Sequence, residues 1–112
     1  MDLQELKFWV GTWAERKGWG FTKRDIPEKL MLVTTELAEA MEDYRDDNHG
    51  MALNEYRLDD KGKPIGFGIE LADSFIRILH ICHRFDIDLE AMTEAKMKYN
   101  ERREFRHGGK IA

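Results

Sequence analysis

The segment of residues 69–85 restricts the possible folds more than any other part of the chain. Wound as a helix, it carries apolar side chains around most of its circumference, which is the pattern of a buried central helix. Its polar residues recur every three or four positions and form one narrow stripe. The stripe consists of Glu70, Asp73, Arg77, His80 and Arg84. We therefore expect this helix to be the central element of the fold.

Three further helices are predicted from hydrophobic periodicity and from helix-start signals. The first spans residues 2–17, and the second extends from Asp25 and Pro27 to about Asn48, because proline is tolerated in the first turn of a helix. The fourth extends over residues 89–105 after an aspartate cap. Its inward positions are expected to be Leu89, Met92, Ala95 or Lys96, and Tyr99.

Residues 51–67, between the second and third helices, do not follow a helical pattern. A short extended piece around Leu58 is followed by a turn-rich run over residues 59–64, which indicates a small hairpin or a mobile flap. With 112 residues, the chain fits one domain and leaves no room for a second core. The prediction is a single all-α domain over residues 1–112, a four-helix bundle with a short non-helical insert.

The composition limits the location and the partners of the chain. Its formal net charge is −4, so no overall positive field favours binding to nucleic acid. The single cysteine, Cys82, is expected to be a buried small hydrophobic residue, and a chain without an intrachain disulfide fits a reducing compartment. The longest apolar runs are far shorter than the ~20 residues of a membrane span. We expect a soluble, cytoplasmic protein that binds neither nucleic acid nor a membrane.

Two acidic couplets, Glu36 with Glu39 and Glu70 with Asp73, suggest a metal site. Carboxylates three residues apart lie on one side of a helix, so two such helices face to face would gather four carboxylates. Like charges this close repel unless a cation lies between them, and Mg²⁺ prefers oxygen ligands. The alternatives are a solvated acidic face for the first couplet and an intrahelical ion pair from Arg77 to Asp73 for the second. One arginine compensates one acid and not four.

Two other groups of residues are candidates for contacts with a ligand. Trp9, Trp13 and Trp19 lie in and just after the first helix, where they either pack in the core or line a pocket for a flat aromatic ligand. Lys96, Asn100 and Arg103 recur on one face of the fourth helix and could reach an oxyanion. The three residues are spaced at i, i+4 and i+7 along the sequence.

The combined pattern resembles the MazG-like family of all-alpha nucleoside triphosphate pyrophosphatases, over about residues 26–110. The signature of that family is ExxE on one helix and ExxD on the next, which matches the two couplets here. The run from Glu28 to Glu36 and the later Lys96-Met97-x-x-Asn100-x-x-Arg103 are similar to family segments as well. Thr35 stands where many relatives have a further glutamate. The gap between the couplets is also longer than usual, so the insert is a candidate substrate-selecting element.

The resemblance implies an enzyme that cleaves the α–β bond of a (deoxy)nucleoside triphosphate to a monophosphate and pyrophosphate, in nucleotide-pool housecleaning. It implies Mg²⁺ as the cofactor, with Mn²⁺ as a substitute, and a homodimer or homotetramer. The implied catalytic and metal residues are Glu36, Glu39, Glu70 and Asp73. The implied substrate contacts are Lys96, Asn100, Arg103, Trp13 and Trp19.

Two alternatives to this function remain open from the sequence. One is a catalytically silent helical dimerisation or adaptor domain, in which the acids are merely solvated. The other is an enzyme similar to phosphoribosyl-ATP pyrophosphatase, which belongs to the same superfamily. A di-iron carboxylate bundle is disfavoured, because such sites use Glu-x-x-His motifs and neither couplet has a histidine in that place.

Overall fold

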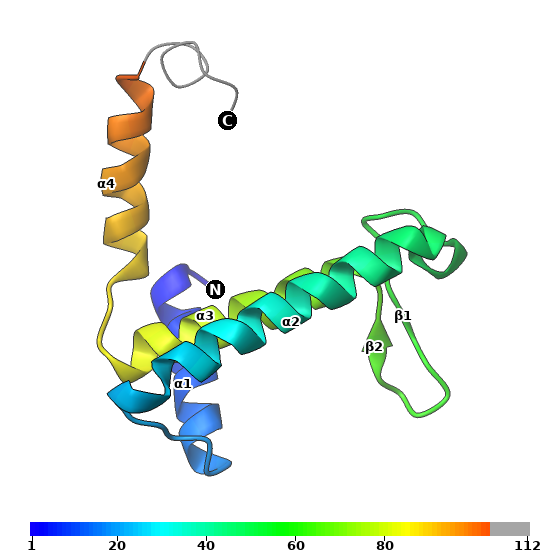
Figure 1. The fold of residues 1–112 in the computed structure, drawn as a ribbon, viewed down its shortest axis with the longest axis horizontal. Coiled ribbons are helices and arrows are strands. Elements are labelled where there is room, and N and C mark those ends of the chain that lie inside the picture. The colour runs from blue at the N-terminus through cyan, green and yellow to red at the C-terminus, as the bar shows by residue number, and fades with distance from the viewer. Residues whose placement is uncertain (104–112) are drawn as a thin grey trace.

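A computed structural model describes residues 1–103, and its elements follow the order predicted from the sequence (Figure 1). The elements are α1 (Leu3–Arg16), η1 (Lys23–Asp25), α2 (Ile26–Arg45), η2 (Asp47–Gly50), β1 (Arg57–Leu58), β2 (Pro64–Ile65), α3 (Phe67–Arg84) and α4 (Leu89–Glu101). The prediction of an all-α fold with four helices and a small hairpin is confirmed. Helix α4 ends at Glu101, four residues before the predicted end at Phe105, and Phe105 itself lies outside the described residues.

The centre of the fold is the antiparallel pair of α2 and α3, which lie side by side (Figure 1). Helix α1 crosses the C-terminal half of α3, where Gly11 is buried so closely against the ring of His83 that a Cβ atom would overlap it. Arg84 of α3 reaches Glu15 of α1 at 3.2 Å and also donates to the carbonyl oxygen of Phe21. These contacts hold α1 against the C-terminal half of α3.

Capping interactions explain where the helices begin. The side chain of Asp2 accepts a hydrogen bond from the backbone N–H of Glu5 at 2.8 Å, which satisfies one of the free amides in the first turn of α1. Pro27 occupies the first turn of α2, where its missing N–H costs nothing. Asp88 accepts from the N–H of Ala91 at 3.0 Å and caps α4, as predicted.

The connection from α2 to α3 is a left-handed turn followed by the hairpin. Asp47, Asn48 and His49 have φ angles of 54°, 49° and 57°, and α2 ends at Arg45, three residues before the predicted end at about Asn48. The side chain of Asn48, which is 1% exposed, donates to the carbonyl oxygen of Ala52 at 2.7 Å. Its Oδ1 accepts from the N–H of Phe67, also at 2.7 Å. Asn48 therefore ties the end of α2 to the first residue of α3.

Two expectations about the core were wrong. Helix α3 is not enclosed, because α1 and α2 cover only part of it and Leu71, Phe75 and Ile76 remain exposed. Helix α4 has no buried residue, and it leads away from the other three helices in Figure 1. Its predicted inward residues are therefore not inside this chain: Leu89 is only half-buried, and Met92, Ala95, Lys96 and Tyr99 are exposed.

Cys82 is buried beside Leu79 in the small core, as predicted. Among the helices that the structure describes, none combines the length and the apolar character needed to cross a membrane.

Candidate active site

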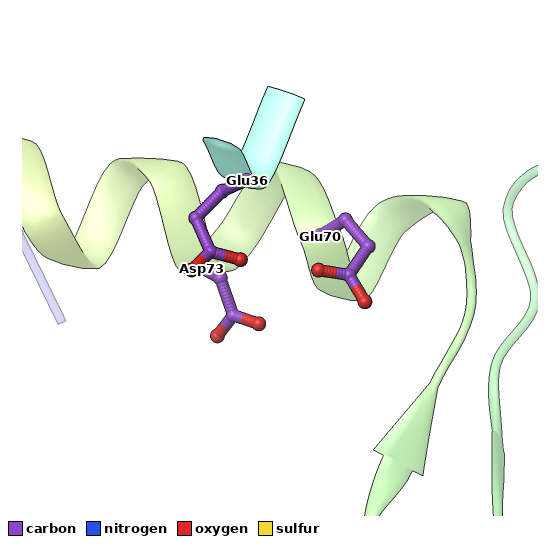
Figure 2. Close-up of side chains that lie close together, drawn as sticks. All are labelled: Glu36, Glu70 and Asp73. Carbon is purple, nitrogen blue, oxygen red and sulfur yellow. The ribbon is translucent and has the colours of Figure 1, made fainter. Parts of the chain in front are cut away.

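Three of the four predicted carboxylates converge where α2 and α3 face each other. Glu36 comes from α2, and Glu70 and Asp73 come from α3; one oxygen atom of each lies within 4.8 Å of the others. In Figure 2 the three side chains extend to the same side of α3, with Glu36 close to Asp73 and Glu70 beside them. The face-to-face arrangement of the two couplets, predicted from their spacing, is thus present for these three residues.

Glu36 is the most buried member of this cluster, with 8% of its surface exposed, whereas Glu70 and Asp73 are half-buried. The sequence predicted the reverse order of burial. The charge of Glu36 is compensated by Arg77, whose Nε lies 3.0 Å from Glu36 Oε1. The predicted alternative, an intrahelical pair between Arg77 and Asp73, is therefore not the pair that forms. Because Arg77 is held by Glu36, the two carboxylates of α3 lack a dedicated cationic partner among residues 1–103.

The environment of the cluster disfavours negative charge on its α3 members. Burial raises the pKa of Glu70 to about 7, assisted by the neighbouring carboxylates of Glu39, Asp73 and Asp43. Burial, followed by the negative charge of Glu36, also raises the pKa of Asp73, and the positive charge of Arg77 opposes that rise. The Oε2 atom of Glu70 is buried and has no hydrogen-bond partner among the described residues. Among the described residues, the cluster thus contains a carboxylate oxygen without a hydrogen-bond donor and negative charge without a dedicated cationic partner.

The fourth predicted carboxylate, Glu39, is exposed and is not one of the three converging residues. It nevertheless lies close enough to Glu70 to accept a hydrogen bond from the protonated form of that residue and to raise its pKa. Asp43 was not among the site residues predicted from the sequence. Asp43 is half-buried, lies 2.9 Å from His49 Nε2 and adds negative charge beside Glu70.

The raised pKa of Glu70 predicts how the stability of the metal-free protein depends on pH. Between about pH 4.5 and pH 7 the folded state binds more protons than the unfolded state, so the free energy of unfolding falls as the pH rises through this window. Glu70→Gln should remove that loss. In the presence of a chelator, we expect the variant to be more stable than the wild type by about 1 kcal/mol at pH 8, since water screens the partly exposed carboxylate.

Urea unfolding at pH 5 and at pH 8 measures this difference. At pH 5 the two proteins should have nearly equal stability, because Glu70 is then largely protonated in the folded wild type. A Glu70→Gln variant that is less stable than the wild type at pH 8 would contradict the prediction.

A cavity of 310 Å³ adjoins the carboxylates and shares Glu36 and Asp73 with them. Trp13 of α1 and Trp19 of the following loop form its aromatic wall, with ring centroids 4.8 Å apart and planes at 89°. Both tryptophans were predicted to contact a ligand, and both line this cavity. Trp9, the third candidate, is 57% exposed and lies outside it.

The predicted phosphate contacts on α4 are not brought to the cluster within one chain. Lys96 Nζ lies 4.9 Å from the centroid of the Tyr99 ring, and Arg103 Cζ lies 5.6 Å from the same centroid. Asn100 Nδ2 is 3.7 Å from Met97 Sδ. Figure 1 shows α4 well separated from the start of α3, where Glu70 lies. These three side chains are grouped with one another around α4.

Five residues that line the cavity were not predicted as ligand contacts: Val10, Ala14, Ile76, Arg77 and His80. Arg77 belongs to the polar stripe of residues 70–84, so its position on the same face as Glu70 and Asp73 was a usable signal. Ile76 had no such signal, because an apolar residue in an apolar helix is expected in the core.

Comparison with protein-family models, with curated proteins and with solved structures finds no match for this chain.

Proposed function

We propose that this chain is a Mg²⁺-dependent hydrolase that cleaves a (deoxy)nucleoside triphosphate at the α–β bond, releasing a nucleoside monophosphate and pyrophosphate. The observation that carries the proposal is the convergence of Glu36, Glu70 and Asp73 beside a cavity walled by two tryptophans. Carboxylates suit the metal that accompanies a triphosphate, and an aromatic wall suits a nucleobase. The two features adjoin, as one nucleotide bound across both would require.

The residues of the cluster fit a magnesium ion. Carboxylate oxygens are the ligands that Mg²⁺ and Mn²⁺ prefer, and the buried Oε2 of ionised Glu70 receives no hydrogen bond from the described residues. We propose that Glu36, Glu70 and Asp73 hold the metal. Bound there, Mg²⁺ would neutralise phosphate charge and lower the pKa of a coordinated water. Glu39, exposed next to Glu70, is the candidate to accept a proton from the attacking water.

We also propose that the chain acts as a homodimer or homotetramer. A groove of 370 Å³ between α2 and α3 is lined by exposed Leu37, Met41, Tyr44 and Leu71. A second copy covering this surface would remove the apolar side chains from water. In such an assembly, Lys96, Asn100 and Arg103 of one chain could contact a triphosphate bound by another chain. Sedimentation at several concentrations should give a dimer or tetramer; a monomer throughout would contradict this.

The same exposed surface favours a second candidate function, a helical adaptor domain that lacks catalysis. In an adaptor the carboxylates need not bind a cation, so the two functions differ in their response to magnesium. A hydrolase of the proposed kind should be stabilised by Mg²⁺, because a ligand that binds only the folded state raises its stability.

The test is a thermal-unfolding titration with Mg²⁺ at pH 7.5. We expect the unfolding temperature to rise with the logarithm of the Mg²⁺ concentration once this exceeds the dissociation constant, by the equivalent of about 2.7 kcal/mol when the metal is at a hundred times that constant. Glu70→Gln should abolish most of that rise. The matched control is Glu42→Gln on the neighbouring helix α2, since Glu42 is exposed and pairs with Arg45 instead. A wild type that Mg²⁺ stabilises no more than it stabilises Glu70→Gln would favour the adaptor.

A further inference from the structure

Arg77 presents an unused hydrogen-bonding edge at the aromatic cavity. Its Nε donates to Glu36 Oε1 at 3.0 Å, which orients the plane of the guanidinium group. Its two terminal nitrogens donate to no residue within residues 1–103, and the side chain remains 40% exposed. Arg77 lines both the 310 Å³ cavity and an adjoining cavity of 80 Å³, and Trp19 lines both as well. The free edge is therefore available to a molecule that lies against Trp19.

The position of Arg77 along α3 places it one turn beyond Asp73, at the aromatic cavity, where Glu36 is the only member of the carboxylate cluster that it bonds to among the described residues. Glu70, Asp73 and Arg77 follow one another on the same stripe, and seven residues of helix separate the first from the last by about 10 Å. Glu70, at the start of this stripe, does not line the aromatic cavity, whereas Asp73, Arg77 and His80 line it together with the two tryptophans. A nucleotide with its phosphates at the carboxylates would thus bring its base to Arg77.

A guanidinium edge discriminates between bases because it contains only donors. Two parallel N–H groups bond best to two adjacent acceptor atoms, as in the bidentate contact of arginine with O6 and N7 of guanine. Cytosine offers an equivalent pair in O2 and N3. Adenine places an amino group beside N1 and N7, and uracil and thymine have an N–H between their two carbonyl oxygens, so none of these three has two adjacent acceptors.

Building on the proposed function, we propose that Arg77 is a specificity-determining residue that selects a base with two adjacent acceptors, cytosine or guanine. Glu36 has a double role in this arrangement. It contributes a carboxylate to the metal cluster, and it holds the guanidinium group in the plane that the base would share. Base recognition and metal binding are therefore coupled through one side chain.

Calorimetric binding of the four monophosphates CMP, GMP, UMP and AMP tests the proposal. We expect CMP or GMP to bind about tenfold or more tightly than both UMP and AMP, which is the discrimination of one bidentate contact. The tighter of the two identifies the base. The monophosphates of 3-deazacytidine and 7-deazaguanosine each lack one of the two acceptors, and they should lose the advantage of their parent without any change to the protein.

Two variants complete the design. Arg77→Lys keeps a positive charge beside Glu36 but lacks the two parallel N–H groups of a guanidinium edge. The variant should therefore bind the four monophosphates with nearly equal affinity. Arg84→Lys is the matched control, because Arg84 belongs to the same stripe but contacts Glu15 and Phe21 and does not line the cavity. It should retain the preference. If Arg77→Lys does not fold, the comparison of the parent and deaza nucleotides on the wild type still decides the matter.

Several results would overturn the proposal. These are equal binding of all four bases, a preference for adenine or uracil, or an unchanged preference in Arg77→Lys. Uniform weakening of all four monophosphates in Arg77→Lys, with their ratio preserved, would assign Arg77 to phosphate instead. Hydrolysis of every triphosphate without base preference refutes only this inference, whereas base preference in binding without any hydrolysis refutes only the proposed reaction.

Discussion

Asp73→Asn is expected to lower the rate of pyrophosphate release by about a hundredfold or more, or about 3 kcal/mol of transition-state stabilisation. The substitution keeps the size of the side chain and removes a negative charge from the proposed metal cluster. The same change should not weaken the fold. Burial and the charge of Glu36 raise the pKa of Asp73, so the ionised carboxylate is unfavourable in the metal-free protein and its neutral replacement is tolerated.

The measurement pairs an assay of pyrophosphate with a thermal-unfolding curve for each variant. Glu39→Gln should lose activity too, because Glu39 is proposed to accept the proton of the attacking water. Asp60→Asn, an exposed substitution in the hairpin, is the control and should remain fully active. Full activity in both Asp73→Asn and Glu39→Gln would show that the carboxylates do not serve the reaction.

Asn48→Ala should reduce the free energy of unfolding by about 3 to 5 kcal/mol, since buried groups would lose their hydrogen-bond partners. Asn48 is almost fully buried and bonds to the carbonyl oxygens of Ala52 and Glu55 and to the N–H of Phe67. Its left-handed backbone adds to the effect, because asparagine tolerates that conformation better than alanine. The change should also weaken stabilisation by Mg²⁺, because Phe67 begins the helix that carries Glu70.

Urea unfolding of Asn48→Ala against Asn54→Ala provides the comparison. Asn54 is exposed in the same connection, and its substitution should change the stability by no more than about 0.5 kcal/mol. A loss below about 1 kcal/mol for Asn48→Ala would mean that its hydrogen bonds do not hold α2 and α3 together.

Local patterns predicted the elements of the fold well, because caps, turns and periodicity are properties of neighbouring residues. Pro27 and Asp88 were sufficient to place the starts of α2 and α4. The spacing of the couplets predicted four converging carboxylates, of which Glu36, Glu70 and Asp73 lie together and Glu39 does not. It could not predict that Glu36 would be the buried member, because that depends on how deeply α2 lies on α3.

The errors concern relations between distant elements. The periodicity of α4 indicated a packed helix, but nothing in residues 89–101 shows whether the surface that covers it belongs to the same chain. The alternative to a metal site paired Arg77 with Asp73, four residues before it, because the sequence alone reveals only partners that are close along the helix. The actual partner, Glu36, is 41 positions away and becomes adjacent only when α2 and α3 pair.

Phosphorus NMR of the products shows directly whether the α–β bond of the triphosphate is the one that is cleaved. The purified protein is incubated with Mg²⁺ and, separately, with each of the four common ribonucleoside triphosphates and their deoxy counterparts. The account predicts a nucleoside monophosphate and pyrophosphate from at least one of them, and no reaction after Asp73→Asn. Orthophosphate with a nucleoside diphosphate, or no turnover of any triphosphate, would contradict it.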